Sequence, residues 1–456
     1  MGSLNASLAI ALSGLAAEQG ALETTSNNVA NVNTPGYSRQ VPVLATSNPV
    51  VIDPLTLGTG VTLLKIESVR DEILESQIQH ESQSQGELSA LVSALSQTEA
   101  SFTTTTADVG TAISNFFNSV NQLSASPADL SLRQSVLTAA GNLARSFNQA
   151  ANNLIGQRSS LDQSVEQTVS QINELTGQIS DLNGRISSLE NAGKSAGTLV
   201  DQRSALIDQL SSLVDVSVIP SDNSLTLTTA SGTALVIGQN KYPLSTSLDS
   251  SGTQHIFSQG ADITSTIVSG QLGGILKARD QQIPSIQADL DTLAAGLANA
   301  ANGVQVAGYD LNGNSSAGQY LFNPPAATGA AASLSVAMTD PALIAASSDG
   351  TGGNNGNAEA LYALRDASMV AGQSPTDYYA GIVFRVGDAS SSAKAEQSAS
   401  ELVLQQLKDQ RASVSGVSLD EEAANMMRYQ QAYSASAQVI STINQMMQDV
   451  IQMKAG

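Results

Sequence analysis

Cysteine and tryptophan are absent from this sequence, and histidine occurs only twice. Without a thiol the chain can form no disulfide, no thiolate nucleophile and no cysteine-ligated metal site. The two histidines, His80 and His255, lie far apart in unlike segments, so a histidine-based catalytic pair is not expected. The sequence therefore offers no cysteine-based site and no histidine-based catalytic pair.

Basic residues are scarce as well. The sequence has 19 Lys and Arg against 40 Asp and Glu, which gives a formal net charge of −21. Because no basic patch can form, we exclude nucleic acid and an anionic membrane surface as partners. No segment reaches the ~18 consecutive apolar residues that a membrane span requires. The N-terminus also lacks the features of a cleaved signal peptide, so a cytoplasmic protein is expected unless another export route reads a different signal.

Two acidic stretches were considered as binding or catalytic sites. Asp310-Leu311-Asn312-Gly313-Asn314 begins like a calcium loop, but its glycine is misplaced and Leu321 stands where a bidentate glutamate is needed, so a turn is predicted. Asp420-Glu421-Glu422 follow Ser418 at a predicted helix start, where capping and the helix dipole explain acids. We predict no enzyme, no catalytic residue, no metal site and no cofactor.

Both ends of the chain carry apolar residues at three- and four-residue steps. This spacing places a narrow apolar seam on a helix and requires a partner helix. The N-terminal seam is Leu4, Leu8, Ala11, Leu15, Leu22 and Val29, and the C-terminal seam is Leu419, Ala423, Met426, Tyr433, Ala437, Ile440, Met447 and Ile451. We predict that the terminal helices pair as a coiled coil and that these residues, with Tyr37, form an assembly interface.

The longest periodic segment runs from Val136 to Leu189 and predicts a helical rod. Gly141 and Gly156 leave open whether that rod is one unbroken helix. Apolar residues then alternate with period two from Val214 to about Val268, which predicts a small β domain inserted in the rod.

The remainder of the chain is less regular. Residues 303–387 are mixed in pattern, and a last helical run is expected from about Ser391 to Ala412, followed by a break at Ser415-Gly416. The predicted fold is mainly α with a small inserted all-β domain that projects outward. Three domains are predicted: a terminal assembly domain (1–45 plus 400–456), a helical rod domain with irregular and strand segments (46–214 plus 270–399) and the β domain (215–269).

Residues 26–40, SNNVANVNTPGYSRQ, follow the first predicted helix. On local evidence they are explained as a helix terminator with a buried Tyr37, in which Pro35-Gly36 fit the centre of a type II turn. The stretch also resembles the signature shared by bacterial flagellar rod, hook and hook-associated proteins. The matching positions are Asn27, Asn28, Asn31, Thr34, Pro35, Gly36, Tyr37, Ser38, Arg39 and Gln40.

Further stretches narrow the resemblance to the hook-associated protein 1 family. They are GVSLDEEAANMMRYQQAYSASAQVI (416–440), LVDQRSALIDQLSSLVDVSV (199–218), SGQLGGILKARD (269–280) and GYDLNGN (308–314). The chain looks compact for that family, so we expect an outer surface domain to be reduced or absent.

The resemblance implies a structural subunit of the flagellum. Copies would form a ring that joins hook to filament, outside the cell, after export through the flagellum's own channel without a cleaved signal peptide. The implied partners are other copies of the chain, the hook protein and the second hook–filament junction protein. An export chaperone is expected on the Met-rich C-terminal helix.

Three alternatives were weighed. The first is another axial subunit: the hook protein, the second junction protein or a flagellin-like protein. Leu419–Glu422 argue against the hook protein, and the TPGYSRQ string argues against flagellin. A secreted translocator would need an apolar hairpin, and a wall hydrolase would need a catalytic set. We also hypothesise that residues 1–40 and 415–456 are largely disordered in the monomer and fold on assembly, because one pair of narrow seams buries little area.

Overall fold

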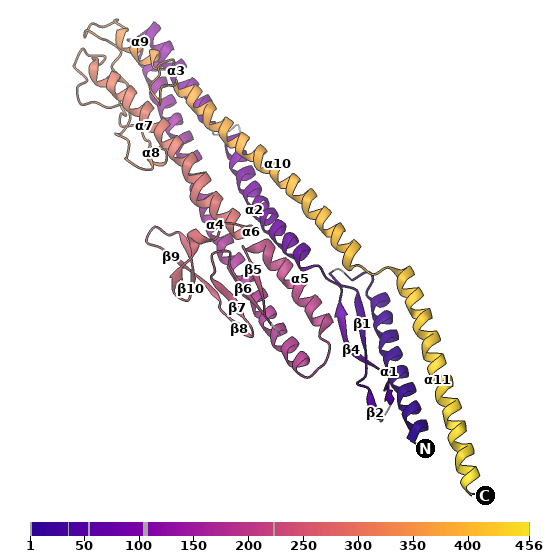
Figure 1. The fold of residues 1–456 in the computed structure, drawn as a ribbon. Coiled ribbons are helices and arrows are strands. Elements are labelled where there is room, and N and C mark those ends of the chain that lie inside the picture. The colour runs from indigo at the N-terminus through magenta and orange to yellow at the C-terminus, as the bar shows by residue number, and fades with distance from the viewer. Residues whose placement is uncertain (1, 35, 53–54, 104–107, 222–223, 456) are drawn as a thin grey trace.

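A computed structural model describes residues 2–34, 36–52, 55–103, 108–221 and 224–455. The protein is elongated, with a helical body, small β-sheets on one side of it and a thinner unit that holds both chain ends (Figure 1). The predicted class, mainly helical with small inserted antiparallel sheets and with paired terminal helices, is confirmed. No helix within the described ranges has the length and hydropathy of a membrane span.

The body is organised around α4 (Leu130–Asn191), a single helix of 62 residues. Asp129 caps it by accepting hydrogen bonds from the backbone amides of Ser131 and Leu132. Gly141 and Gly156 lie within it without interrupting it, which answers the question that the sequence left open. Most of its apolar stripe is buried between Val136 and Ile186, so packing along the helix compensates for its four glycines, which are poor helix formers.

Other helices cover α4 and form one main core. They are α2 (Glu72–Thr103), α3 (Val109–Ala125), α7 (Ile283–Ala307), α9 (Gly356–Ala363) and α10 (Pro375–Ser415), with the short α8 (Ala330–Ser333) and the 3-10 turn η3 (Pro341–Leu343). Phe116, Phe117, Phe147 and Phe322 are fully buried in this core.

The expected start of the last body helix at Ser391 is wrong, because α10 begins at Pro375. Ser374 caps the helix by accepting from the Asp377 amide, and proline occupies its first position, where no amide donor is needed. Tyr378, Tyr379 and Ile382 bury this first part of α10 against the core. The Ser-Pro start signal was present in the sequence, but the glycine-rich surroundings hid it.

The Asp310 segment is a turn, as predicted. The Asp310 carboxylate accepts from the backbone amides of Asn312 and Asn314, both at 2.8 Å. Gly313 has a φ of +77°, in the left-handed region that favours glycine. The Asp310 carboxylate thus stabilises the turn by binding backbone amides within the same segment.

The β domain follows α5 (Gly197–Leu213) and consists of two antiparallel sheets. The first has the order β5-β6-β7-β8 (Ser217–Ser221, Ser224–Thr228, Ala234–Ile237, Asn240–Lys241), and the second the order β11-β10-β9 (Ala261–Asp262, Gln254–Ser258, Leu244–Leu248). Their buried residues belong to the same apolar cluster as Val165 of α4 and Leu210 of α5. The sheets therefore fold onto the helices rather than around a separate core.

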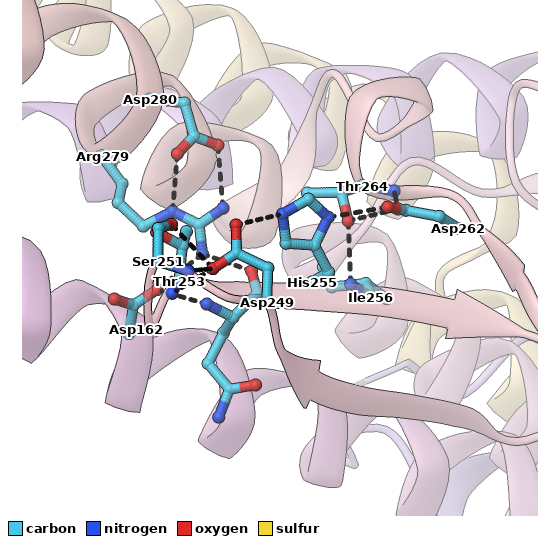
Figure 2. A network of polar contacts seen from close by, with 11 residues as sticks. Asp162, Asp249, Ser251, Thr253, His255, Ile256, Asp262, Thr264, Arg279 and Asp280 are labelled. Atoms are coloured by element: carbon cyan, nitrogen blue, oxygen red, sulfur yellow. Dashed lines mark hydrogen bonds and ion pairs between the residues drawn. The ribbon is translucent and has the colours of Figure 1, made fainter.

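A buried arginine fastens the second sheet to the body (Figure 2). The chain returns from the sheet through η1 (Thr264–Thr266), α6 (Gly270–Lys277) and a π-helical turn, η2 (Ala278–Gln282), that carries Arg279. Arg279 is 1% exposed and donates to Asp162 of α4 at 2.8 Å and to the carbonyl of Gln254 in β10 at 2.7 Å. Asp280 accepts from Nε and Nη2, so each of the three guanidinium nitrogens has a partner.

His255, also in β10, lies between two carboxylates (Figure 2). Its Nδ1 is 2.7 Å from Asp262 and its Nε2 is 3.5 Å from Asp249. Hydrogen bonds from Thr264 lower the pKa of Asp262 to about 2, and the Thr253 amide does the same for Asp249. The histidine thus ties the β9–β10 turn to β11.

Where the β domain joins the body, three backbones touch. Gly270 has a φ of +72°, and a Cβ there would lie 2.4 Å from the backbone nitrogen of Val214. A Cβ on Gly86 of α2 would lie 2.1 Å from the carbonyl oxygen of Ser212, and one on Gly274 of α6 would lie 2.2 Å from that of Glu87. Glycine is required at this crossing because α2, α5 and α6 leave no room for a side chain.

Beside this crossing, Asp215 is a buried acid whose charge is only partly compensated. It is 0% exposed, and neither carboxylate oxygen has a partner in hydrogen-bonding geometry. Burial raises its pKa to about 6, and the nearby Ala230 amide offsets only part of that shift. Because the folded pKa lies above the unfolded value, stability is lost as pH rises from about 4 to about 6.

We therefore expect Asp215→Asn to stabilise the protein at neutral pH and to change little near pH 4. A shift of this size corresponds to a gain of roughly 1–3 kcal/mol at pH 7. Urea unfolding of both proteins at pH 4 and pH 7 measures it. An equal effect at the two pH values would contradict the assignment.

The terminal unit contains α1 (Gly2–Ala30), α11 (Leu419–Ala455) and two hairpin sheets. β1 (Gln40–Thr46) pairs with β4 (Val61–Ser68), and β2 (Val50–Ile52) pairs with β3 (Leu55–Leu57). The predicted domain boundaries after residues 45 and 399 pass through β1 and α10, so the three-domain division stays a proposal. In the structure the break in the C-terminal part is at Gly416, between α10 and α11.

Candidate functional site

The two terminal helices run side by side from the body (Figure 1). Of the predicted N-terminal seam, Ala11 is buried and Leu4, Leu8, Leu15, Leu22 and Val29 are half-buried. Of the predicted C-terminal seam, Met426, Ala437, Ile440 and Met447 are half-buried, whereas Leu419, Ala423, Tyr433 and Ile451 are exposed. The role of these residues in assembly stays a prediction.

The apolar residue of α11 with the least exposure is Ile443, which the predicted seam omitted. Ile443 is 7% exposed, and Ser436, Tyr429 and the buried Glu422 precede it at heptad spacing, the first two half-buried. This stripe includes serine and tyrosine, so a search for aliphatic residues missed it. The predicted C-terminal seam lies beside this stripe, rotated from it around the helix axis by somewhat less than the ~100° that separates consecutive residues.

Helix α1 has a second partner, strand β4, in addition to α11. The Ser13 hydroxyl accepts a hydrogen bond from the Val61 amide at 3.3 Å, and a Cβ on Gly20 would lie 2.7 Å from the Leu63 side chain. Strand β4 therefore packs against α1 beside α11. Ala17 and Ala21, 2% and 0% exposed, are small enough for this close approach.

The signature segment is held by Asn28 at the end of α1. The Asn28 amide group donates to the Gln40 carbonyl at 2.8 Å and accepts from the Gln40 amide at 2.9 Å. Its oxygen also accepts from the Tyr37 hydroxyl at 2.8 Å. Asn28 is 1% exposed, so these bonds are shielded from water. Its side chain satisfies both the amide and the carbonyl of Gln40, the first residue of β1, as the backbone of a neighbouring strand would.

Between Asn28 and Gln40 the chain forms the predicted turn. The Asn31 side chain donates to the Asn27 carbonyl and side chain, both at 2.9 Å, and Thr34 donates to Asn31. Gly36 has a φ of +78°, and the Tyr37 amide donates to the Thr34 carbonyl at 3.2 Å, as in a type II turn. Pro35, the remaining predicted turn residue, lies outside the described residues.

Ser38 connects the signature segment to the body. It is buried and accepts from Arg70 Nε at 3.2 Å. Arg70 precedes α2 and also pairs with Asp201 and donates to Ser204, both on α5. The Arg70 guanidinium, which lies between the start of α2 and α5, thus fastens the loop that follows α1 to the body.

Arg39 connects the same segment to the break between α10 and α11. Its backbone amide donates to the Ser415 carbonyl at 2.8 Å, and its guanidinium pairs with Glu421 and lies 3.8 Å from Glu422. Ser418 does cap α11, as predicted, by accepting from the Glu421 amide at 3.4 Å. The ion pairs were missed because nothing in the sequence links residues this far apart.

Two more side chains complete this junction. Arg411, near the end of α10, lies 3.0 Å from Asp208 of α5 and 3.4 Å from Glu75 of α2. The pKa of Tyr37 is raised to about 12, first by burial and then by the charges of Asp201 and Glu422. Tyr37 therefore stays a neutral donor to Asn28, and its half-buried side chain makes an internal contact.

We expect Asn28→Ala to loosen this junction strongly. The substitution removes three hydrogen bonds and leaves the buried amide and carbonyl of Gln40 unpaired, at a cost of about 2–4 kcal/mol. In isolated flagella, where the terminal helices are paired, amide exchange at residues 37–41 and 61–68 should be faster in Asn28→Ala than in Asn33→Ala, which changes an exposed asparagine of the same segment. Equal exchange in the two variants would count against the role given to Asn28.

Among the described side chains, no group of three or more His, Asp or Glu is arranged to hold a metal ion. The site is instead a mechanical junction, in which the segment after α1 is fastened to α2, to α5 and to the start of α11. Such an arrangement positions the helices relative to one another.

Three family models match the chain. The model described as "Flagellar hook-associated protein FlgK helical domain" matches residues 95–322. "Flagella basal body rod protein" matches residues 8–37, and "Flagellar basal body rod FlgEFG protein C-terminal" matches residues 409–453. The last two cover α1 with its signature segment and α11, the elements that meet at the junction.

Relatives with known names match along nearly the whole chain. Flagellar hook-associated protein 1 of Bacillus subtilis is 30% identical over 96% of each chain. The protein of the same name from Escherichia coli is 27% identical over 95% of this chain and 97% of its own. The structure of the flagellar hook junction protein FlgK from Burkholderia pseudomallei covers 74% of this chain with a TM-score of 0.67 at 20% identity, which shows a shared fold. The helical domain, the two terminal matches and the full-length relatives agree, and this chain belongs to the flagellar hook-associated protein 1 family.

Proposed function

We propose that this chain is a structural subunit of the junction between the hook and the filament of the bacterial flagellum. The observation that carries the proposal is the match to hook-associated protein 1 along nearly the full length of both chains. Membership in a structural flagellar family agrees with the prediction that the chain is not an enzyme. It also places the protein in the axial structure of the flagellum, outside the cell.

Assembly proceeds through the terminal unit. Helices α1 and α11 pair with each other and leave apolar residues such as Leu419, Tyr433 and Ile451 exposed on one flank. Apolar surface of this kind is favourable only when it is covered. Neighbouring copies in a ring supply the cover, and the hook protein and the second junction protein contact the two sides of that ring.

The export chaperone binds α11 before secretion. Met427, Met446 and Met453 are 59%, 50% and 77% exposed, and flexible methionine side chains suit a surface that binds different partners in turn. Capture of the chaperone by residues 1–410 alone would rule this out.

The position in the flagellum is the direct test. A strain without the gene is complemented with the chain carrying an epitope in the β9–β10 turn, and the flagella are labelled with gold. We expect filaments to be restored and label only at the boundary between hook and filament. Label along the filament would identify a flagellin-like subunit, and label along the hook would identify a hook subunit.

The isolated monomer should keep its ends largely unfolded. Ordering them costs about 1–2 kcal/mol of backbone entropy per residue, which one pair of helices with half-buried seams cannot offset. Amide exchange of the purified monomer is therefore expected to be fast in 8–29 and 419–450 and slow in α4. Strong protection of 8–29 in solution would overturn this mechanism.

A further inference from the structure

The surface of the paired terminal helices has no charged side chain over most of its length. Helix α1 has no charged residue before Glu18, and α11 has none between Arg428 and Asp449. Large apolar side chains are nevertheless exposed in these stretches, among them Ile10 at 40%, Val439 at 50% and Met446 at 50%. The chain as a whole has a net charge of −21, so an uncharged and partly apolar surface on it stands out. Such a surface is typical of a site at which another molecule binds.

On one flank of α11 this surface is hollowed. A cavity of about 580 Å³ opens between α1, the turn that precedes β4, and α11, and we call it the terminal socket. Its rim is formed by Ile10 and Val439, and its wall includes Gly14, Gly60, Ala435 and Ser436. The socket is large enough for an aromatic side chain and mostly apolar in its lining.

Two glycines keep the socket open. A Cβ on Gly60, whose φ is +106°, would lie 2.0 Å from the Ser13 hydroxyl, so the turn can approach α1 only as glycine. A Cβ on Gly14 would lie 3.5 Å from Ser436 Oγ, which is ordinary contact. A larger residue at position 14 would therefore fill the socket without separating the two helices.

The opposite flank of α11 presents projecting side chains. Tyr433 is 36% exposed and Ile451 is 59% exposed, and because they are five helical turns apart they lie on one line. At about 100° per residue, Tyr433 lies roughly 120° around the helix from Val439. The stripe that contacts α1 runs between the two flanks.

We propose that the terminal socket receives Tyr433 of a second copy of this chain. The inference rests on the proposed function, because it presupposes that copies assemble. Two copies of charge −21 repel each other unless they meet across uncharged surface, and both the socket and Tyr433 lie in the uncharged stretches. Tyrosine is also favoured as an interface anchor, since its ring fills an apolar pocket and its hydroxyl meets hydroxyls such as that of Ser436.

The contact is head-to-tail. Tyr433 and the socket lie on flanks of α11 that are roughly 120° apart, so we assign a different neighbour to each flank rather than one two-fold partner to both. The contact therefore continues from copy to copy around a ring or along a helix. Each copy uses one flank of α11 for each neighbour.

The absence of cysteine makes a cross-linking test simple. One copy carries Tyr433→Cys and the other Val439→Cys, both full length and co-expressed in the deletion strain, and isolated flagella are treated with a mild oxidant. We expect a disulfide-linked dimer on a non-reducing gel only when both variants are present. Met427→Cys, on the face of α11 turned away from α1, is the matched control and should give no dimer with Val439→Cys.

The outcomes separate the two proposals. Normal filaments without a Tyr433→Cys–Val439→Cys dimer, or an equally strong dimer from Tyr433→Cys alone, overturn the socket and leave the junction function intact. Label away from the junction overturns the function itself. If the cysteine variants do not enter flagella, Gly14→Leu decides: it should reduce incorporation at least tenfold while Gly141→Leu incorporates normally, and normal incorporation of Gly14→Leu overturns the proposal.

Discussion

Replacing Ile443 by aspartate is expected to abolish incorporation of the chain into flagella and to leave its body folded. Ile443 is the apolar residue of α11 with the least exposure, and it lies in the stripe that α1 covers. A carboxylate there would be buried without a partner, which costs several kcal/mol. The terminal unit has no large core from which to recover that energy, whereas the body keeps the two clusters built on α4.

Gln445→Asp is the matched control, because it adds the same charge on the exposed, opposite side of α11. Swimming and the number of filaments per cell measure incorporation, and far-UV circular dichroism of the purified monomer measures the body. The same loss is expected for Leu15→Asp and Ile440→Asp in the predicted seams. Normal swimming by Ile443→Asp would show that α11 does not pair with α1 in the assembled flagellum.

Exchanging one glycine for alanine should destabilise the body at one position and stabilise it at another. At Gly274 the new methyl group would lie 2.2 Å from the Glu87 carbonyl oxygen and 2.9 Å from its carbon. Because these are backbone atoms, α2 and α6 must separate, and we expect a loss of roughly 3 kcal/mol or more. The crossing that joins the β domain to the body would loosen with them.

Gly141 is also helical, but a Cβ there would meet nothing within 4 Å. Alanine should therefore stabilise α4 by about 0.5–1 kcal/mol, because glycine loses more backbone entropy on folding. Urea unfolding of the two variants measures both effects. Equal changes of one sign would refute the close packing assigned to Gly274.

Elements with a long, single period could be predicted from the sequence. The stripe from Val136 to Leu189 identified α4, and the change to period two at Val214 identified the β domain. Both signals are local and repeat many times, so a single glycine such as Gly156 does not hide them. The first turns of α10 escaped because Pro375 and its cap stand alone in an irregular stretch.

The junction could be predicted only in part. The turn at Gly36 follows from local backbone preference, and the sequence contained it. The pairing of Asn28 with Gln40 and of Arg39 with Glu422 depends on how distant segments meet, which no periodicity encodes. The facing stripe of α11 was displaced from the prediction for a related reason, since small and polar residues such as Ser436 pack well where two helices approach closely.

The terminal unit leaves the body through two covalent connections, one from β4 to α2 at residues 69–71 and one from α10 to α11 at residues 416–418. A single linker would let the unit swivel about one bond axis. Two linkers side by side, with Arg39 bridging from one chain segment to the other, resist twisting as well as pulling. A subunit connected in this way keeps the terminal unit and the body at a fixed angle, so a twist applied to one of them is carried to the other.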